Sequence, residues 1–109
     1  MAQKRIPQKV MRPVRQYLQI LKADNLPIES AFLFGSFAKG KPNKWSDIDV
    51  CIISPRFKDS WQALQYLWSK RLVDTGLTIE PVGFSPRDFS EDSSLTSEIK
   101  KTGIRIPVI

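Results

Sequence analysis

The sequence predicts a small domain of the α/β class, in which a single mixed sheet packs against helices. Three observations lead to this class. Short apolar runs bounded by Gly, Pro or Asn predict strands over residues 28–34, 47–54 and 77–83. Apolar residues at helical spacing predict helices over 13–24, 60–73 and 95–102. Strands and helices therefore alternate along the chain, which is typical of one sheet with helical connections.

The first helix is predicted from Pro13 to Asp24. Its apolar residues fall on one face, and proline suits the first turn of a helix. Those apolar residues are Val14, Tyr17, Leu18 and Leu21. Asn25-Leu26-Pro27 ends the helix. We therefore expect a flexible basic lead-in over residues 1–12 and one domain over 13–109.

The second half of the chain has its own start and stop signals. Asp59 or Ser60 is expected to cap the amphipathic helix over 60–73, and Gly76 to close it. Ser85-Pro86 predicts a short helical turn, and Gly103 stops the helix over 95–102. Residues 104–109 are expected to form an edge strand or a docking tail.

Composition limits the class of protein. The chain has 109 residues, 41% hydrophobic and 26% charged, as expected for a single globular domain. It contains no run of about 20 apolar residues that would span a bilayer, and its first residues lack the apolar segment of a signal peptide. We therefore expect a cytoplasmic protein with no membrane partner. The chain has no histidine, which excludes Ser-His-Asp chemistry and His-based zinc sites, and its one cysteine, Cys51, lies in an apolar strand.

Positive charge is concentrated at the start of the chain. Six basic residues precede the first acid, Asp24, and they equal the whole net charge of +6. They are Lys4, Arg5, Lys9, Arg12, Arg15 and Lys22. The simplest interpretation is a solvated helix face, and the alternatives are docking to an acidic partner or to nucleic acid. No aromatic residue precedes Tyr17, so a stacking platform for single strands is not indicated.

The main functional signal lies in residues 35–50. Gly35-Ser36 is followed after ten residues by Asp47-Ile48-Asp49, which opens an apolar strand. Two carboxylates two positions apart on a strand point to the same face, where they repel unless a cation lies between them. Mg²⁺ suits such a pair because it binds carboxylates together with substrate phosphates. The Gly-Ser turn offers backbone N–H groups and a hydroxyl to those phosphates.

A third carboxylate is expected from a two-metal site. Glu80 is the best candidate because it interrupts an otherwise apolar strand, where an acid is costly unless it is paired or bound to metal. The competing interpretation is a Glu that faces water from an edge strand. Asp74 and Asp88 are weaker rivals, since both lie at predicted turns.

Over residues 13–105 the chain resembles the minimal nucleotidyltransferases, small relatives of the DNA polymerase beta and kanamycin nucleotidyltransferase group. The family motif is Gly-Ser, about ten residues, Asp-x-Asp and a later acid on a neighbouring strand, and residues Gly35, Ser36, Asp47, Asp49 and Glu80 occupy these positions. Many relatives have Asp where this chain has Glu80. The resemblance implies a nucleotidyltransferase fold, a mixed sheet with helices on one face and the active site on the open face.

The resemblance also implies roles for these residues. Gly35 and Ser36 would hold the β- and γ-phosphates of an NTP, taken to be ATP. Asp47 and Asp49 would bind two Mg²⁺ ions, and Glu80 would complete one ion site and help to activate the acceptor hydroxyl. Residues Lys39, Lys41 and Lys44 lie in the intervening loop and would neutralise the triphosphate, although a solvated loop is an equal interpretation of each.

Minimal members of the family are often paired with a helical HEPN toxin. They act as its antitoxin, and some transfer AMP to a tyrosine of the toxin. The resemblance thus implies an adenylyltransferase with a HEPN partner. Two alternatives stay open: a non-catalytic module that blocks its partner sterically, and an enzyme that modifies RNA ends or a small molecule. The sequence leaves nucleotide preference and self-association open.

Overall fold

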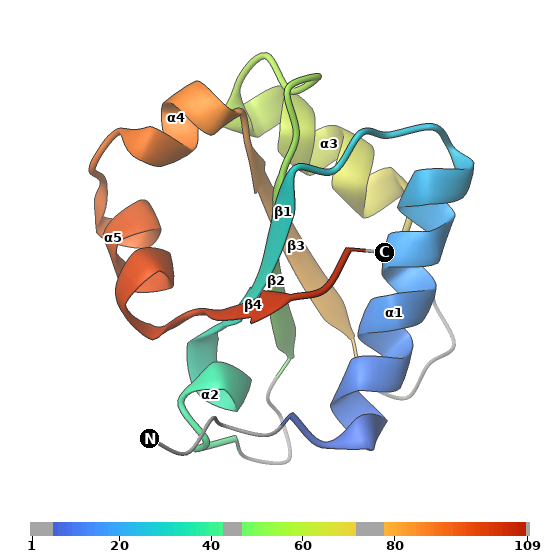
Figure 1. Cartoon of the computed structure of the whole chain (residues 1–109), viewed down its shortest axis with the longest axis vertical. Coiled ribbons are helices and arrows are strands. Elements are labelled where there is room, and N and C mark those ends of the chain that lie inside the picture. The colour runs from blue at the N-terminus through green and yellow to red at the C-terminus, as the bar shows by residue number, and fades with distance from the viewer. Residues whose placement is uncertain (1–5, 43–46, 72–77, 109) are drawn as a thin grey trace.

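The computed structural model describes residues 6–42, 47–71 and 78–108. Four strands form one sheet in the order β3-β2-β1-β4, and helices pack on both sides of it (Figure 1). In chain order the elements are α1 (Gln8–Ala23), β1 (Ser30–Phe34), α2 (Gly35–Ala38), β2 (Ile48–Ile53), α3 (Ser60–Ser69), β3 (Ile79–Phe84), α4 (Pro86–Ser90), α5 (Ser94–Thr102) and β4 (Ile104–Ile106). The predicted mixed α/β class is confirmed.

The sheet is mixed because its strand pairs differ in direction. β1 pairs antiparallel with both β2 and β4, whereas β2 pairs parallel with β3. In this register Asp49 lies between Phe34 on one neighbouring strand and Glu80 on the other. The end of β1 and the beginnings of β2 and β3 therefore meet at one end of the sheet, the lower end in Figure 1.

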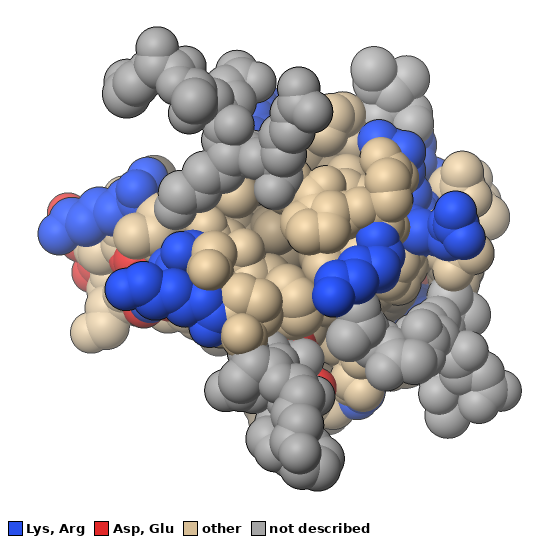
Figure 2. All heavy atoms as spheres, turned by 90° about the horizontal axis from the view of Figure 1, so that it is seen from below, with Lys and Arg blue, Asp and Glu red and all other residues tan. Residues whose placement is uncertain are grey.

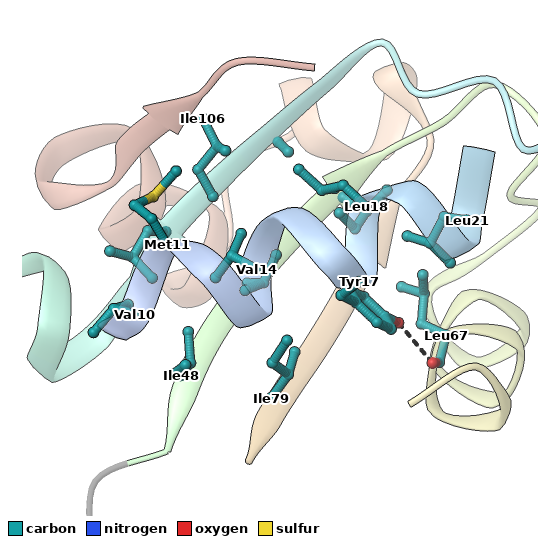
Figure 3. Close-up of a cluster of buried hydrophobic side chains, with 14 of the residues drawn as sticks. Val10, Met11, Val14, Tyr17, Leu18, Leu21, Ile48, Leu67, Ile79 and Ile106 are labelled. Atoms are coloured by element: carbon teal, nitrogen blue, oxygen red, sulfur yellow. Dashed lines mark hydrogen bonds between the residues drawn. The ribbon is translucent and has the colours of Figure 1, made fainter. Parts of the chain in front are cut away.

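The main core lies between one face of the sheet and helices α1 and α3 (Figure 3). On β2 the alternate residues Ile48, Val50 and Ile52 point into it, as their spacing predicts. Tyr17 on α1 is fully buried, and its hydroxyl donates a hydrogen bond of 2.6 Å to the carbonyl oxygen of Leu67 on α3. This bond joins the two helices beneath the sheet.

The second face of the sheet is covered only in part. Helices α4 and α5 pack on it through a smaller apolar cluster whose buried members are Phe34, Cys51, Ile53, Phe84 and Ile99. The predicted helices on one face correspond to α1 and α3. The second face carries α4 and α5, so this face is open at the lower end of the sheet. Cys51 is buried, which raises the pKa of its thiol to about 12 and makes it unreactive at neutral pH.

Helix α1 begins earlier than the sequence predicts. The sequence predicts a start at Pro13, but the helix begins at Gln8. The amide groups of Val10 and Met11 donate to the carbonyl of Pro7. Both of these side chains are buried against the sheet. Burial of two large apolar side chains outweighs the cost of placing a proline inside the helix.

Most other boundaries agree with the prediction to within two residues. Asp59 and Ser85 cap α3 and α4 through their side chains, and residues 104–106 form the expected edge strand. Helix α3 ends at Ser69, earlier than the predicted end at residue 73, because the amides of Lys70 and Arg71 donate three residues back and so close the last turn. The predicted closure at Gly76 lies outside the described residues. None of the helices in the described ranges has the length and apolar character needed to cross a membrane.

Candidate active site

The turn after β1 is held by a glycine that lies against a carboxylate. Gly35 begins the four-residue helix α2 and has φ of 75°, a conformation that other residues adopt only with strain. A β-carbon at this position would overlap Oδ2 of Asp49 and lie 3.0 Å from its Cγ. The Gly-Ser turn and the second acid of Asp-x-Asp, predicted to lie at neighbouring strand ends, are therefore in contact.

Three carboxylates meet beside this turn. Asp47 directly precedes β2, Asp49 lies on β2, and Glu80 lies opposite Asp49 on the parallel strand β3. Asp49 and Glu80 point to the second face of the sheet, since their strand neighbours Ile48 and Ile79 enter the main core. The structure thus brings together all three acids that the sequence singled out.

The rival third acids are not placed at this site. Asp74 lies outside the described residues. Asp88 lies in α4, which follows the far end of β3, and its amide is bonded to the Ser85 side chain. Glu80 is therefore the candidate that the fold places beside the Asp pair.

The electrostatics of the three acids favour shared protons or a bound cation. Partial burial raises the pKa of Asp49, and the neighbouring Asp47 and Glu98 raise it further. A hydrogen bond with Asp47 raises the pKa of Glu80, and burial adds to this effect. Like charges at such close range cannot all ionise without cost. A divalent cation would remove that cost, so the cluster is suited to bind one.

The donor set fits Mg²⁺ when a phosphate ligand accompanies it. No group of three His, Cys, Asp or Glu side chains in the described ranges forms a ready-made metal cage. Mg²⁺ does not require one, because it is usually bound through one or two carboxylates plus water and substrate phosphates. Asp47 and Asp49 supply such a pair of carboxylates, with Glu80 beside them.

Two charged residues near the site were missed by sequence reasoning. Glu98 on α5 lies close enough to raise the pKa of Asp49 and forms an ion pair of 3.6 Å with Lys39. Arg71 follows α3 and lowers the pKa of Glu80. Both are far from the motif in sequence, so only the packing of α3 and α5 against the sheet reveals them.

Arg71 is held in place by an aromatic ring. Its guanidinium group lies 4.0 Å from the ring centre of Trp68, and its buried Nε has no hydrogen-bond partner among the described residues. Stacking of this kind orients a guanidinium group without using its donors. Arg71 is therefore a fixed positive charge near the acids.

The predicted triphosphate-binding lysines are only partly supported. Lys39 is half exposed and paired with Glu98, Lys41 is exposed, and Lys44 lies outside the described residues. Seen from the lower end of Figure 1, the molecule nevertheless exposes many Lys and Arg side chains and few acids (Figure 2). A positive field of this kind attracts polyphosphate ligands.

Comparisons with known proteins identify the family of the chain. Residues 14–106 match the family model described as nucleotidyltransferase domain. The chain belongs to this family, and it is therefore a transferase of the nucleotidyltransferase class. The fold is also similar to the crystal structure of a protein from Sulfolobus solfataricus described as a "putative nucleotidyltransferase", with a TM-score of 0.61 and 14% sequence identity over 96% of this chain and 89% of that one. No curated protein matches the chain.

Proposed function

We propose that this protein is a Mg²⁺-dependent adenylyltransferase that moves AMP from ATP to a tyrosine hydroxyl of a HEPN-type toxin and thereby acts as its antitoxin. The observation that supports this most directly is the meeting of Asp47, Asp49 and Glu80 beside the Gly35 turn. The site lies at the end of the sheet, and its acids are half-buried rather than enclosed. A hydroxyl on a folded protein can therefore approach them.

Different residues of the site bind the phosphates and the metal ion. The backbone of Gly35 and Ser36 and the Ser36 hydroxyl hold the terminal phosphates. Asp47 and Asp49 hold Mg²⁺, which when bound neutralises the phosphate charge and favours an ionised acceptor. Lys39 and Lys41 add positive charge at the entrance of the site.

The transfer itself exchanges a phosphoanhydride bond for a phosphoester bond. The acceptor oxygen forms a bond to the α-phosphorus, the bond from that phosphorus to the bridging oxygen of the β-phosphate breaks, and pyrophosphate leaves. The proton of the hydroxyl passes to the Glu80 carboxylate. The positive charge of Arg71 opposes the hydrogen bond with Asp47, the burial and the neighbouring acids, which together raise the pKa of Glu80.

The test is label transfer from ATP labelled at the α-phosphate to a purified HEPN-type partner in the presence of Mg²⁺. We expect labelled partner with the wild-type protein and none with Asp47→Asn/Asp49→Asn. Asp92→Asn is the matched control, since the Asp92 side chain is 88% exposed and forms an ion pair with Lys100.

Each other outcome supports a competing function. A tight, unlabelled complex that still neutralises the partner when both acids are replaced would support steric blocking. Label on tRNA ends or on an aminoglycoside without any protein acceptor would support the third alternative.

A further inference from the structure

An apolar groove runs beside the free edge of β3, on the same strand that carries Glu80. It has a volume of 380 Å³ and lies between α3 and the beginning of α5. Its large lining side chains are Trp61, Leu64, Val82, Phe84 and Leu95. None of the described residues that line it is charged, so the groove favours a neutral, apolar ligand over nucleic acid.

Trp61 forms an exposed wall of this groove. Its side chain is 65% exposed, although it belongs to α3. Two large hydrophobic side chains are exposed in the described ranges, and that of Trp61 has the larger exposed fraction. The other, Trp68, is 42% exposed and stabilises the fold, because its Nε1 donates a hydrogen bond to the carbonyl oxygen of Pro81. Trp61 forms no such bond in the described part of the chain, and an exposed indole beside an apolar groove is typical of a binding surface.

The edge of β3 offers backbone groups to a ligand beside the groove. The amides of Ile48 and Ser54 donate to the carbonyl oxygens of Thr78 and Phe84, so the even-numbered residues of β3 pair with β2. The odd-numbered residues therefore turn their backbone groups outward. Pro81 has no N–H, and Trp68 occupies its carbonyl. Gly83, within the groove, is left with an outward N–H and C=O.

We infer that this groove binds an extended segment of the acceptor protein, which pairs with the backbone of Gly83 and inserts a large apolar side chain between Trp61 and Leu95. An edge strand beside a helix is the usual setting for strand addition, in which the backbone gives affinity and a side-chain pocket gives specificity. Trp68 and Pro81 interrupt the edge next to Gly83 and so prevent backbone pairing from continuing along the strand past Pro81.

The position of the groove connects it to the active site. Val82 lines the groove and lies two residues after Glu80 on the same face of β3, roughly 7 Å away along the strand. The bound segment continues from the groove toward the beginning of β3. The residue that lies two or three positions from the inserted apolar side chain then reaches the acids. This last step, the delivery of a hydroxyl, depends on the proposed function, whereas binding in the groove does not.

The experiment measures binding alone, without ATP or Mg²⁺. Short synthetic peptides that contain tyrosine and, two positions away, Leu, Phe or Ser are titrated into ¹⁵N-labelled protein. We expect the Leu and Phe peptides to shift the amide signals of Gly83 and Phe84 and the indole signal of Trp61, and the Ser peptide to have little effect. N-methylation of the amide that pairs with Gly83 should abolish the shifts.

Three variants make the test specific. Trp61→Ala should weaken the Leu peptide by about tenfold, as expected for a tryptophan anchor. Leu95→Asn should weaken it similarly from the opposite wall, and its spectrum reports whether the fold is intact. Gln65→Ala, at an exposed position of the same helix, should leave affinity unchanged.

Several results would overturn the inference. These are the absence of shifts with every peptide, shifts that Trp61→Ala or N-methylation leaves unchanged, and concentration-dependent shifts of the same amides in the protein alone. The last would identify a second copy of the chain as the occupant. A peptide that binds but receives no label from ATP would count against the proposed function and leave the groove assignment standing.

Discussion

The Asp49 carboxylate lies directly against the α-carbon of Gly35, at the point where β1 turns into α2. Two residues fourteen positions apart in sequence thus form one contact at the lower end of the sheet. The contact requires glycine for two separate reasons, the positive φ of the turn and the space that the carboxylate occupies.

Alanine substitutions can separate these two reasons. Gly40 has φ of 72°, nearly that of Gly35, but a β-carbon there would meet nothing within 4 Å. Gly40→Ala should therefore cost only the left-handed strain, about 1–2 kcal/mol. Gly35→Ala should cost more, because it also displaces Asp49, and it should abolish ATP binding in the presence of Mg²⁺. Urea unfolding and nucleotide titration of the two variants check this, and equal losses in both would contradict the contact.

Asp49 is expected to destabilise the protein when no cation is bound. Its pKa in the folded state is raised above the ordinary value of 3.8, chiefly by burial, so ionisation disfavours folding. The penalty is absent below pH 3.8 and develops as the pH rises through the higher folded pKa. Asp49→Asn should therefore raise the melting temperature at neutral pH in EDTA.

The pH dependence provides the control for this prediction. Near pH 3.8 and below, Asp49 is protonated in the folded state, and the advantage of Asn should shrink. Asp92→Asn, at an exposed position, should show no comparable gain at neutral pH. A wild-type protein more stable than Asp49→Asn in EDTA at neutral pH would contradict the assigned cause of the raised pKa.

The acids could be located from sequence because their signals are local. Asp47 and Asp49 open an apolar run, and Glu80 interrupts one, so the alternation of the strands already places Asp49 and Glu80 on the face opposite the core. The family resemblance then indicated that these strands are neighbours. The exact pairing of Asp49 with Glu80 required the structure.

Features that depend on packing between distant elements could not be predicted. The early start of α1 depends on burial of Val10 and Met11 against the sheet, which outweighs the signal of Pro13. Glu98 and Arg71 act on the acids only because α5 and the end of α3 lie close to them. No local pattern in the sequence reports such contacts.

The hydrogen bond between α1 and α3 should contribute measurably to stability. Tyr17→Phe removes the hydroxyl that donates to the Leu67 carbonyl, which still accepts from the Lys70 amide. The loss of this buried hydrogen bond should cost about 0.5–1.5 kcal/mol in urea unfolding. Tyr66→Phe is the matched control, because the Tyr66 hydroxyl bonds to Asp24 at the surface. A smaller loss for Tyr17→Phe than for Tyr66→Phe would contradict the structural role of the buried bond.

Arg71 should influence the acidic limit of activity. It is the cation that lowers the pKa of Glu80, against the hydrogen bond and the charges that raise it. Replacing it with Met removes that effect, so the pKa of Glu80 rises and a higher pH is needed to ionise the carboxylate. Under the proposed function, the acidic limb of the pH–rate profile of Arg71→Met should therefore move to higher pH, with a smaller change in the rate on its plateau.

A neighbouring cation separates this effect from a general loss of positive charge. Lys70 precedes Arg71 but forms its ion pair with Asp24, at 3.4 Å, and does not act on Glu80. Lys70→Met should leave the acidic limb in place. If Arg71→Met lowers the rate equally at every pH, Arg71 acts by binding substrate rather than through the pKa of Glu80. A shift of the acidic limb in both variants would indicate that net charge alone determines it.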